Sequence, residues 1–345
     1  MTPVVLIASY LEPDLVERIR RVDDRIEVLY EPELLPQPQF PADHRGLPFT
    51  RTAAQEARWR ALLTRAEILF DFDRSHGVDL PFVAPHVTWI QATSSGIGEY
   101  VRRMGYERTM PKTVFTTAAG VHAQPLAEFC LMVMLAFHKR LPQVLHDQRR
   151  KHWERFAATD LRGRTLVIVG VGRVGQEIAR IAQVLGMRVV GVKRSVEGVH
   201  PADLHLDSLV APADLPQALA MAENLVLIAP HTGETEQMIG ARELAMLPAG
   251  AVFINIGRGV LVDEAALIRA LESGALLGAG LDVFAEEPLP PESPLWEMPN
   301  VIVSPHSAST SDRENARITE LFCANLECFL AGRPLMNQLD LERGY

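Results

Sequence analysis

The sequence is poor in cysteine and aromatic residues and has no excess of basic charge. Of 345 residues, 3 are cysteine and 6% are aromatic, and 43 acidic residues outnumber 34 lysines and arginines, for a formal net charge of −9. A nucleic-acid or anionic-membrane binder needs a basic surface, so the composition argues against both partners. It does not forbid a locally basic pocket for an anion.

The cysteines Cys130, Cys323 and Cys328 form no CxxC or Cys/His spacing typical of zinc, and we expect no metal site. Cys323 and Cys328 stand five residues apart on an expected helix, so they do not share a face. We expect reduced, buried thiols in a cytoplasmic protein.

Long hydrophobic runs are also missing. The longest, Phe129–Phe137, is too short to span a bilayer and predicts a buried helix. The first ten residues lack the basic region of a signal peptide and predict a first strand.

Short apolar, β-branched runs alternate with helical stretches along the chain, a pattern typical of parallel sheets covered on both faces. The first series of expected strands is Val4–Ala8, Ile26–Tyr30, Glu67–Phe70, Thr88–Gln91 and Thr113–Thr116. The second is Thr165–Val169, Arg188–Val192, Asn224–Ala229, Ala251–Asn255, Gly278–Val283 and Val301–Ser304. Amphipathic helices are expected at Gln55–Thr64, Val174–Leu185 and Asp263–Glu272. The fold class is therefore α/β, with two doubly wound parallel-sheet domains.

Two long helices mark the expected domain organisation. The helix expected at Gln124–Leu141 separates the two strand series, and the one at Ser311–Leu330 follows the last strand. The simplest arrangement is a discontinuous first domain, residues 1–116 and 310–345, interrupted by a second domain, residues 117–309. The stretch Glu31–Pro48 carries five prolines and is expected to be a loop.

The second domain begins with a G-x-G-x-x-G turn between its first strand and the following helix. Gly170 would allow the tight turn, Gly172 would let backbone approach a pyrophosphate, and Gly175 would let helix pack on strand. The helix N-terminus offers N–H groups to a phosphate. This context predicts dinucleotide binding, with a merely structural turn as the alternative.

No acid stands at the end of the second strand, where an NAD enzyme usually binds the ribose 2′-hydroxyl. The residues there are Lys193, Arg194 and Ser195. Two cations and a hydroxyl suit a 2′-phosphate, so we expect NADP(H) to be preferred and NAD(H) to remain possible. A solvated basic turn is the alternative.

Three charged residues, Arg258, Glu287 and His306, follow strands of the second series. Ligands of open α/β sheets bind outside the carboxyl ends of the strands. These three side chains can therefore converge on the reactive end of a cofactor.

These residues lie in segments that resemble one family, the D-isomer-specific 2-hydroxyacid dehydrogenases. The segments are GVGRVG, NIGRGVLVDEAAL, GLDVFAEEPLP and SPHSA, in that order. The basic turn and the segment PLPPESPLW are most similar to the glyoxylate/hydroxypyruvate reductase branch. The resemblance implies a Rossmann cofactor domain inserted in a discontinuous flavodoxin-like substrate domain.

The resemblance also implies a catalytic triad of Arg258, Glu287 and His306. His306 would donate a proton to the carbonyl oxygen of a 2-keto acid, since imidazole titrates near neutral pH. Glu287 would hold the ring and favour its protonated form. Arg258 would grip the keto acid as a planar fork on a planar anion.

Further positions carry over from the family. The implied cofactor-binding residues are Gly170, Gly172, Arg173, Val174, Gly175, Lys193, Arg194, Ser195, Pro230, His231, Thr232, Ile256, Asp282 and Ser309. The implied substrate-binding residues are Ser95, Gly96 and Ile97, in a loop whose N–H groups would hold the substrate carboxylate, together with Arg258. Asp282 could instead order its turn, residues 93–98 could be an ordinary glycine turn, and Ser309 stands where the family often has glycine.

The sequence thus favours a cytoplasmic NADPH-dependent reductase of small 2-keto acids such as glyoxylate and hydroxypyruvate, giving D-2-hydroxy acids. The family implies a homodimer, with an arm at Gln143–Phe156 that sequence alone describes only as an amphipathic surface stretch. One alternative is an NAD-linked phosphoglycerate-type dehydrogenase, against which we count the lack of a regulatory domain after Tyr345. Another is a cofactor-sensing corepressor on the same fold.

Overall fold

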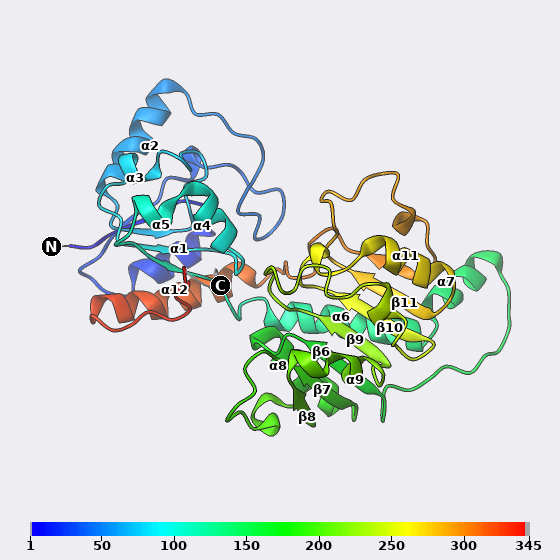
Figure 1. The fold of residues 1–345 in the computed structure, drawn as a ribbon. Coiled ribbons are helices and arrows are strands. Elements are labelled where there is room, and N and C mark those ends of the chain that lie inside the picture. The colour runs from blue at the N-terminus through cyan, green and yellow to red at the C-terminus, as the bar shows by residue number, and fades with distance from the viewer. Residues whose placement is uncertain (1, 342–345) are drawn as a thin grey trace. The chain divides into compact units, whose positions relative to one another are not determined.

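The computed structural model describes residues 2–341. The expected domain bounds also include residues 1 and 342–345, which lie outside the described part. The chain divides into two compact units (Figure 1). Unit 1 is Met1–Val121 with Thr310–Tyr345, and unit 2 is His122–Ser309. Among the described residues no helix is both long enough and apolar enough to cross a membrane.

Unit 1 contains a five-stranded parallel sheet in the order β2-β1-β3-β4-β5, which is a flavodoxin-like order. Its strands are β1 (Val4–Ile7), β2 (Glu27–Leu29), β3 (Ile68–Phe70), β4 (Trp89–Gln91) and β5 (Val114–Thr116). Its helices are α1 (Pro13–Arg20), α2 (Ala53–Arg65), α3 (Leu80–Val83), α4 (Gly98–Met104), α5 (Tyr106–Thr109) and α12 (Glu314–Leu330).

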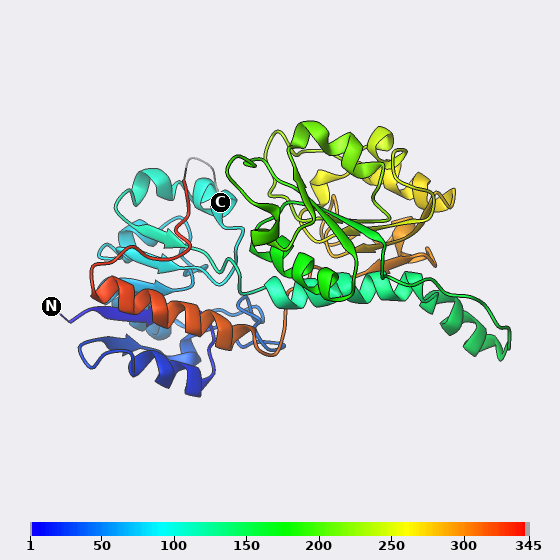
Figure 2. The same ribbon diagram turned by 90° about the horizontal axis from the view of Figure 1, so that it is seen from below.

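The strands of unit 1 are apolar on both faces because helices cover both. Helix α12 covers one face of the sheet (Figure 2). The ring of its Phe322 stacks on that of Trp89, with the ring centroids 5.0 Å apart. On the other face Leu6, Leu69 and Ile90 belong to a second core cluster. The return of the chain from unit 2 into α12 therefore completes the core of unit 1.

Unit 2 contains a seven-stranded parallel sheet in the order β12-β11-β10-β9-β6-β7-β8. Its strands are β6 (Thr165–Val169), β7 (Arg188–Val192), β8 (Ser208–Val210), β9 (Asn224–Leu227), β10 (Ala251–Asn255), β11 (Leu276–Leu281) and β12 (Val301–Val303). Its helices are α6 (Ala123–His138), α7 (Leu141–Arg150), α8 (Arg173–Val184), α9 (Leu215–Leu219), α10 (Ala241–Leu244) and α11 (Glu264–Glu272). The order is that of a dinucleotide-binding fold with one strand added, and it reverses between β6 and β9.

Helix α6 packs closely on the sheet because β11 carries glycines beneath it. A Cβ on Gly278 would lie 2.3 Å from the Phe137 ring, and one on Gly280 would lie 2.5 Å from Val133. Each of these glycines thus makes room for one large side chain of α6.

The structure corrects several expectations about individual elements. The helix expected over Gln124–Leu141 ends at His138, and Arg140 adopts a φ of 57° before α7 begins. Pro142 has no N–H to continue the first helix, so a new one starts there. Strand β8 was not predicted, because three half-buried residues at a sheet edge form no apolar run.

Two smaller expectations were also wrong. Cys328 is only partly buried, whereas Cys130 and Cys323 are buried, and all three thiols are free. The proline-rich stretch is not purely a loop, since Pro32–Leu34 form a short 3-10 helix and Leu34 is buried in the core.

Candidate active site

The glycine turn after β6 meets the neighbouring strand end at van der Waals contact. Gly170 has a φ of 107°, and a Cβ on it would lie 2.7 Å from the backbone of Ile228 and Ala229. A Cβ on Gly175 would lie 2.4 Å from the Gly170 carbonyl oxygen, whereas around Gly172 there is open space. Only glycine fits at the first and third positions, and at the second the backbone at the start of α8 is accessible.

The remaining residues of the expected cofactor site follow strand ends on the same edge of the sheet. Arg173 is exposed and Val174 is half-buried in the first turn of α8. Lys193, Arg194 and Ser195 directly follow β7, and the Lys193 N–H donates to Val210 of β8 over 3.1 Å. The structure therefore places the basic turn one strand away from the glycine turn.

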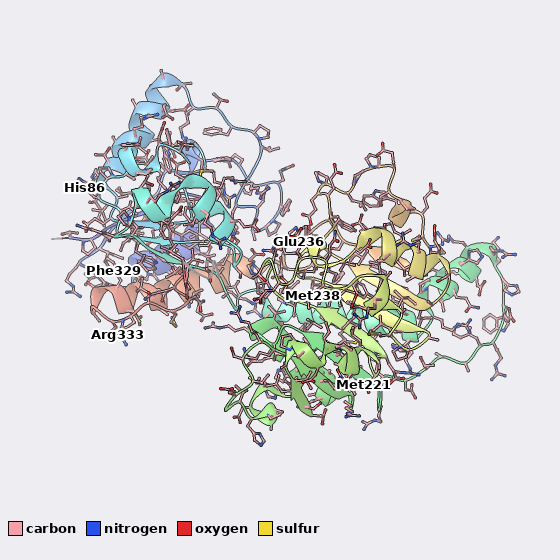
Figure 3. The ribbon with its side chains drawn as sticks, in the orientation of Figure 1. His86, Met221, Glu236, Met238, Phe329 and Arg333 are labelled. Carbon is pink, nitrogen blue, oxygen red and sulfur yellow. The ribbon has the colours of Figure 1, made fainter. Side chains whose placement is uncertain are left out.

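The loop after β9 holds Pro230, His231 and Thr232. Thr235 fastens this loop, because its hydroxyl donates to the Pro230 carbonyl over 2.8 Å and accepts from the Thr232 N–H over 2.8 Å. His231 Nε2 lies 3.9 Å from an oxygen of Glu236, which is labelled in Figure 3.

The expected catalytic residues follow strands whose backbone hydrogen bonds continue past the strand ends. The Ile256 N–H donates to Leu227, the Asp282 N–H to Asn255 and the Ser304 N–H to Leu281, over 2.8–3.1 Å. These bonds align the segments that carry Arg258, Glu287 and His306 along one edge of the sheet.

His306 and Glu287 form a direct pair. The ring Nδ1 of His306 lies 2.7 Å from Oε2 of Glu287, and Oε1 of Glu287 accepts from the Phe284 N–H over 3.1 Å. The His306 side chain is 49% exposed, so a ligand can reach it. His306 has a φ of 53°, in the left-handed region that non-glycine residues rarely adopt.

Asp282 holds the histidine loop in place. Its Oδ1 accepts from the Ser304 hydroxyl over 2.6 Å and from the N–H groups of Ser307 and Ala308 over 2.8 and 2.9 Å. Burial raises the pKa of the Asp282 carboxyl, and these hydrogen bonds oppose that shift. The geometry supports the turn-ordering alternative for Asp282, alongside any contact with a cofactor.

Arg258 is exposed on a loop that the side chain of Asn255 holds by hydrogen bonds. Asn255 donates from Nδ2 to the Arg258 carbonyl over 3.0 Å, and its Oδ1 accepts from the Gly257 N–H over 3.1 Å. One guanidinium N–H of Arg258 donates to the Gly257 carbonyl over 2.7 Å. Sequence reasoning missed Asn255, although an Asn two residues before a glycine at a strand end is a recognisable turn signal.

The loop that carries Arg258 packs directly on the segment that leads to Glu287. A Cβ on Gly259 would lie 1.9 Å from the carbonyl carbon and oxygen of Phe284. The Ala285 N–H next to this contact donates to Glu264 over 3.0 Å. Sequence reasoning missed this backbone contact, because a single glycine in a glycine-rich segment does not indicate what it touches.

The other expected binding residues are divided between unit 2 and unit 1. Ile256 is buried in the core of unit 2, and Ser309 is half-buried at its last residue. Ser95 and Gly96 are exposed in unit 1, while the Ile97 side chain is buried in its core, so that only the backbone of Ile97 can face a ligand.

The sequence between residues 131 and 308 matches the family model of the D-isomer specific 2-hydroxyacid dehydrogenase, NAD binding domain. The chain belongs to this family. It is an NAD(P)-dependent D-2-hydroxyacid dehydrogenase that acts on CH–OH donors.

Similar proteins include reductases and one longer kind of dehydrogenase. The enzyme is 33% identical over 242 residues to a glyoxylate reductase of Korarchaeum cryptofilum, covering 68% of this chain and 72% of that protein. It is 30% identical over 235 residues to a D-3-phosphoglycerate dehydrogenase of Archaeoglobus fulgidus, covering 66% and 43%.

Among solved structures, a D-isomer specific 2-hydroxyacid dehydrogenase of Xanthobacter autotrophicus in complex with NADPH and MES superposes with a TM-score of 0.78, at 27% identity and full coverage of both chains. A probable 2-hydroxyacid dehydrogenase of Rhizobium etli with NADP, HEPES and tartaric acid gives 0.74, at 25% identity and full coverage.

Proposed function

We propose that the enzyme reduces small 2-keto acids of the glyoxylate and hydroxypyruvate type to D-2-hydroxy acids, with NADPH as the preferred cofactor. The observation that carries this proposal is the 2.7 Å pair between His306 and Glu287, presented at the strand ends beside the Arg258 loop. A proton donor and an anion-binding guanidinium are what reduction of a 2-keto acid requires beyond the hydride.

The residues of unit 2 fit a dinucleotide. The open space at Gly172 and the N-terminus of the twelve-residue helix α8 offer backbone N–H groups to a pyrophosphate. When bound, the nicotinamide supplies the hydride. We assign residues 117–309 to this cofactor domain and residues 1–116 and 310–345 to the substrate domain.

In the proposed reaction His306 moves the proton. Its Nδ1 is engaged by Glu287, so Nε2 is the nitrogen that donates to the carbonyl oxygen of the keto acid. The oxygen becomes the hydroxyl of the product, and His306 is left neutral until it takes up a proton from solvent. Glu287 keeps the ring oriented throughout, since its second oxygen is tied to the Phe284 N–H.

Arg258 binds the other end of the reacting group. One of its N–H groups is used by Gly257, which orients the guanidinium and leaves donors for the keto acid carboxylate. We also assign a substrate-binding role to the backbone N–H groups of Ser95, Gly96 and Ile97 in unit 1.

The cofactor preference rests on Lys193, Arg194 and Ser195. A carboxylate at the end of β7 would accept from the ribose 2′-hydroxyl and repel a 2′-phosphate, and none is present in this turn. The arginine fork suits a phosphate better than a hydroxyl.

The proposed assembly is a homodimer. Apolar side chains on α6, α7 and the segment after α7 are exposed, and α7 projects away from the sheet of unit 2 (Figures 1 and 2). They are Met132, Leu135, Leu141, Val144, Leu145, Trp153 and Phe156. An exposed apolar surface of this kind is typical of an interface.

We place the enzyme in the cytoplasm, where three free thiols are kept reduced.

The test is a panel of glyoxylate, hydroxypyruvate, pyruvate and 3-phosphohydroxypyruvate, each assayed with NADPH and with NADH. The loss of cofactor absorbance measures the reaction. Turnover of the small acids with NADPH, giving the D product on chiral chromatography, is the expected result. Turnover confined to the phosphorylated acid with NADH would favour a phosphoglycerate-type dehydrogenase. Cofactor binding without any turnover would indicate a sensing protein.

A further inference from the structure

Asp71, a buried acidic residue of unit 1, has no role in the chemistry described so far. Asp71 is 1% exposed, and no donor from residues 2–341 lies within hydrogen-bond distance of either of its carboxylate oxygens. Asp73 and Asp282 are buried to the same degree, yet each accepts hydrogen bonds from side-chain and backbone donors. A buried carboxylate without donors is strongly unfavourable and needs a physical reason.

The place of Asp71 in the sheet supplies one. The strand order β2-β1-β3-β4-β5 reverses between β1 and β3, and Asp71 directly follows β3. Ligands of doubly wound sheets bind at the carboxyl ends of strands, at such a switch point. Asp71 therefore stands where this sheet is expected to meet a ligand.

The backbone places Asp71 beside the proposed substrate loop. Its N–H donates to the carbonyl of Gln91, the last residue of β4, over 2.7 Å, and the loop with Ser95 and Gly96 begins just beyond Gln91. Neighbouring strands lie about 4.8 Å apart, close to the length of a three-carbon acid. Asp71 also has a φ of 66°, a strained conformation that structures retain where it serves a function.

His76, five residues along the chain, is engaged by other carboxylates and forms no hydrogen bond with Asp71. His76 is shared between Asp73 and Glu56, with its ring nitrogens 2.6 and 2.7 Å from their oxygens. That network satisfies its own carboxylates and leaves Asp71 as an acceptor at the end of β3. Such a group binds a hydrogen-bond donor or a cation and repels an anion.

We propose that Asp71 determines substrate specificity: it selects 2-keto acids that carry a hydroxyl or a cationic group on the side chain and rejects those that carry a second anion. This inference rests on the proposed function. With the carboxylate of hydroxypyruvate on the Ser95–Gly96 loop, the 3-hydroxyl donates to Asp71. A phosphate ester at the same carbon meets the Asp71 charge instead.

The experiment compares kcat/KM of the wild type and Asp71→Asn for hydroxypyruvate and pyruvate, which differ only by that hydroxyl. Asparagine keeps the size and tolerates the left-handed backbone. We expect the wild type to prefer hydroxypyruvate, and Asp71→Asn to reduce the preference about ten- to a hundredfold, the range for one hydrogen bond to a charged group. Activity on 3-phosphohydroxypyruvate should rise in the variant, and activity on 5-guanidino-2-oxopentanoate should fall.

Thermal unfolding gives an independent readout. Asp71→Asn removes an unpartnered buried charge, so its Tm should rise. The matched control is Asp73→Asn, two residues away, which removes a partnered buried charge. It should lower Tm and leave the hydroxypyruvate to pyruvate ratio within about twofold of the wild type, because Asp73 is satisfied by His76 and Ser75.

Two results would overturn the inference. If Asp71→Asn changes kcat/KM for every keto acid by the same factor and lowers Tm, Asp71 is structural. If it changes neither the ratio nor Tm, the carboxylate is satisfied by solvent and does not contact substrate. Pyruvate reduction by the wild type separates these results from failure of the proposed function, in which no keto acid is reduced and both proposals fall.

Discussion

The contact between Gly259 and Phe284 offers a sharp test of how the site is assembled. A Cβ at residue 259 would lie 1.9 Å from the Phe284 carbonyl group, whereas ordinary contact needs at least about 3.4 Å. Gly259→Ala must therefore push the two backbones apart by about 1.5 Å. One backbone carries Arg258 and the other leads to Glu287, so the variant separates groups that have to act together. A misplacement of about 1 Å can reduce activity about a hundredfold.

We therefore expect Gly259→Ala to lose about a hundredfold or more in kcat/KM for glyoxylate, with an overpacking cost of about 1–3 kcal/mol in the free energy of unfolding. NADPH affinity, measured by fluorescence titration, should fall much less than kcat/KM, because the glycine turn and the basic turn follow other strands, β6 and β7. The control is Gly233→Ala, since no atom lies within 4 Å of a Cβ there. A Gly259→Ala enzyme that keeps more than half its kcat/KM and its wild-type Tm would refute the reasoning.

Three further predictions concern single charged residues. Arg258→Lys keeps the charge but loses the fork, so kcat/KM for keto acids should fall about tenfold or more, and unchanged values for every substrate would make Arg258 structural. Arg194→Ala should weaken NADPH about tenfold and leave NADH almost unchanged, and equal effects on both would make the basic turn a solvated surface. The hydrogen bond to Asp73 raises the pKa of His76, so its stabilising contribution is complete below about pH 6.5 and is lost as pH rises through the folded pKa. Urea unfolding across this range should therefore show a steeper loss of stability in the wild type than in His76→Gln, and parallel curves would contradict the assignment.

The sequence predicts the two sheets well because their strands are apolar on both faces and stand out against polar connections. It predicts β8 poorly, since Ser208–Val210 is a short, half-buried edge strand with no apolar run. It also places the end of the first long helix three residues too late, at Leu141 instead of His138, because the left-handed backbone of Arg140 leaves no mark in the sequence. The periodicity of apolar residues in a sequence indicates which side chains are buried. Neither the edge strand nor the end of the helix changes that pattern enough to be recognised.

The chemistry-bearing residues are predicted by motif, and the residues that support them are not. His306 and Glu287 stand in recognisable segments, and the structure brings their side chains together. Asn255 and Gly259 act through backbone contacts that depend on how two loops meet in space. Asp71 gives no signal, because a single aspartate after an apolar strand reads as an ordinary exposed turn residue until its burial is known.

The most direct test of the central claim is the kcat of His306→Gln for glyoxylate reduction with saturating NADPH. Glutamine keeps a hydrogen-bond donor of similar size but has no transferable proton, and general acid catalysis typically contributes about 10²- to 10⁴-fold. We expect kcat to fall by that factor and the Kd for NADPH to stay nearly unchanged. A His306→Gln enzyme that retains more than half of the wild-type kcat would contradict this expectation.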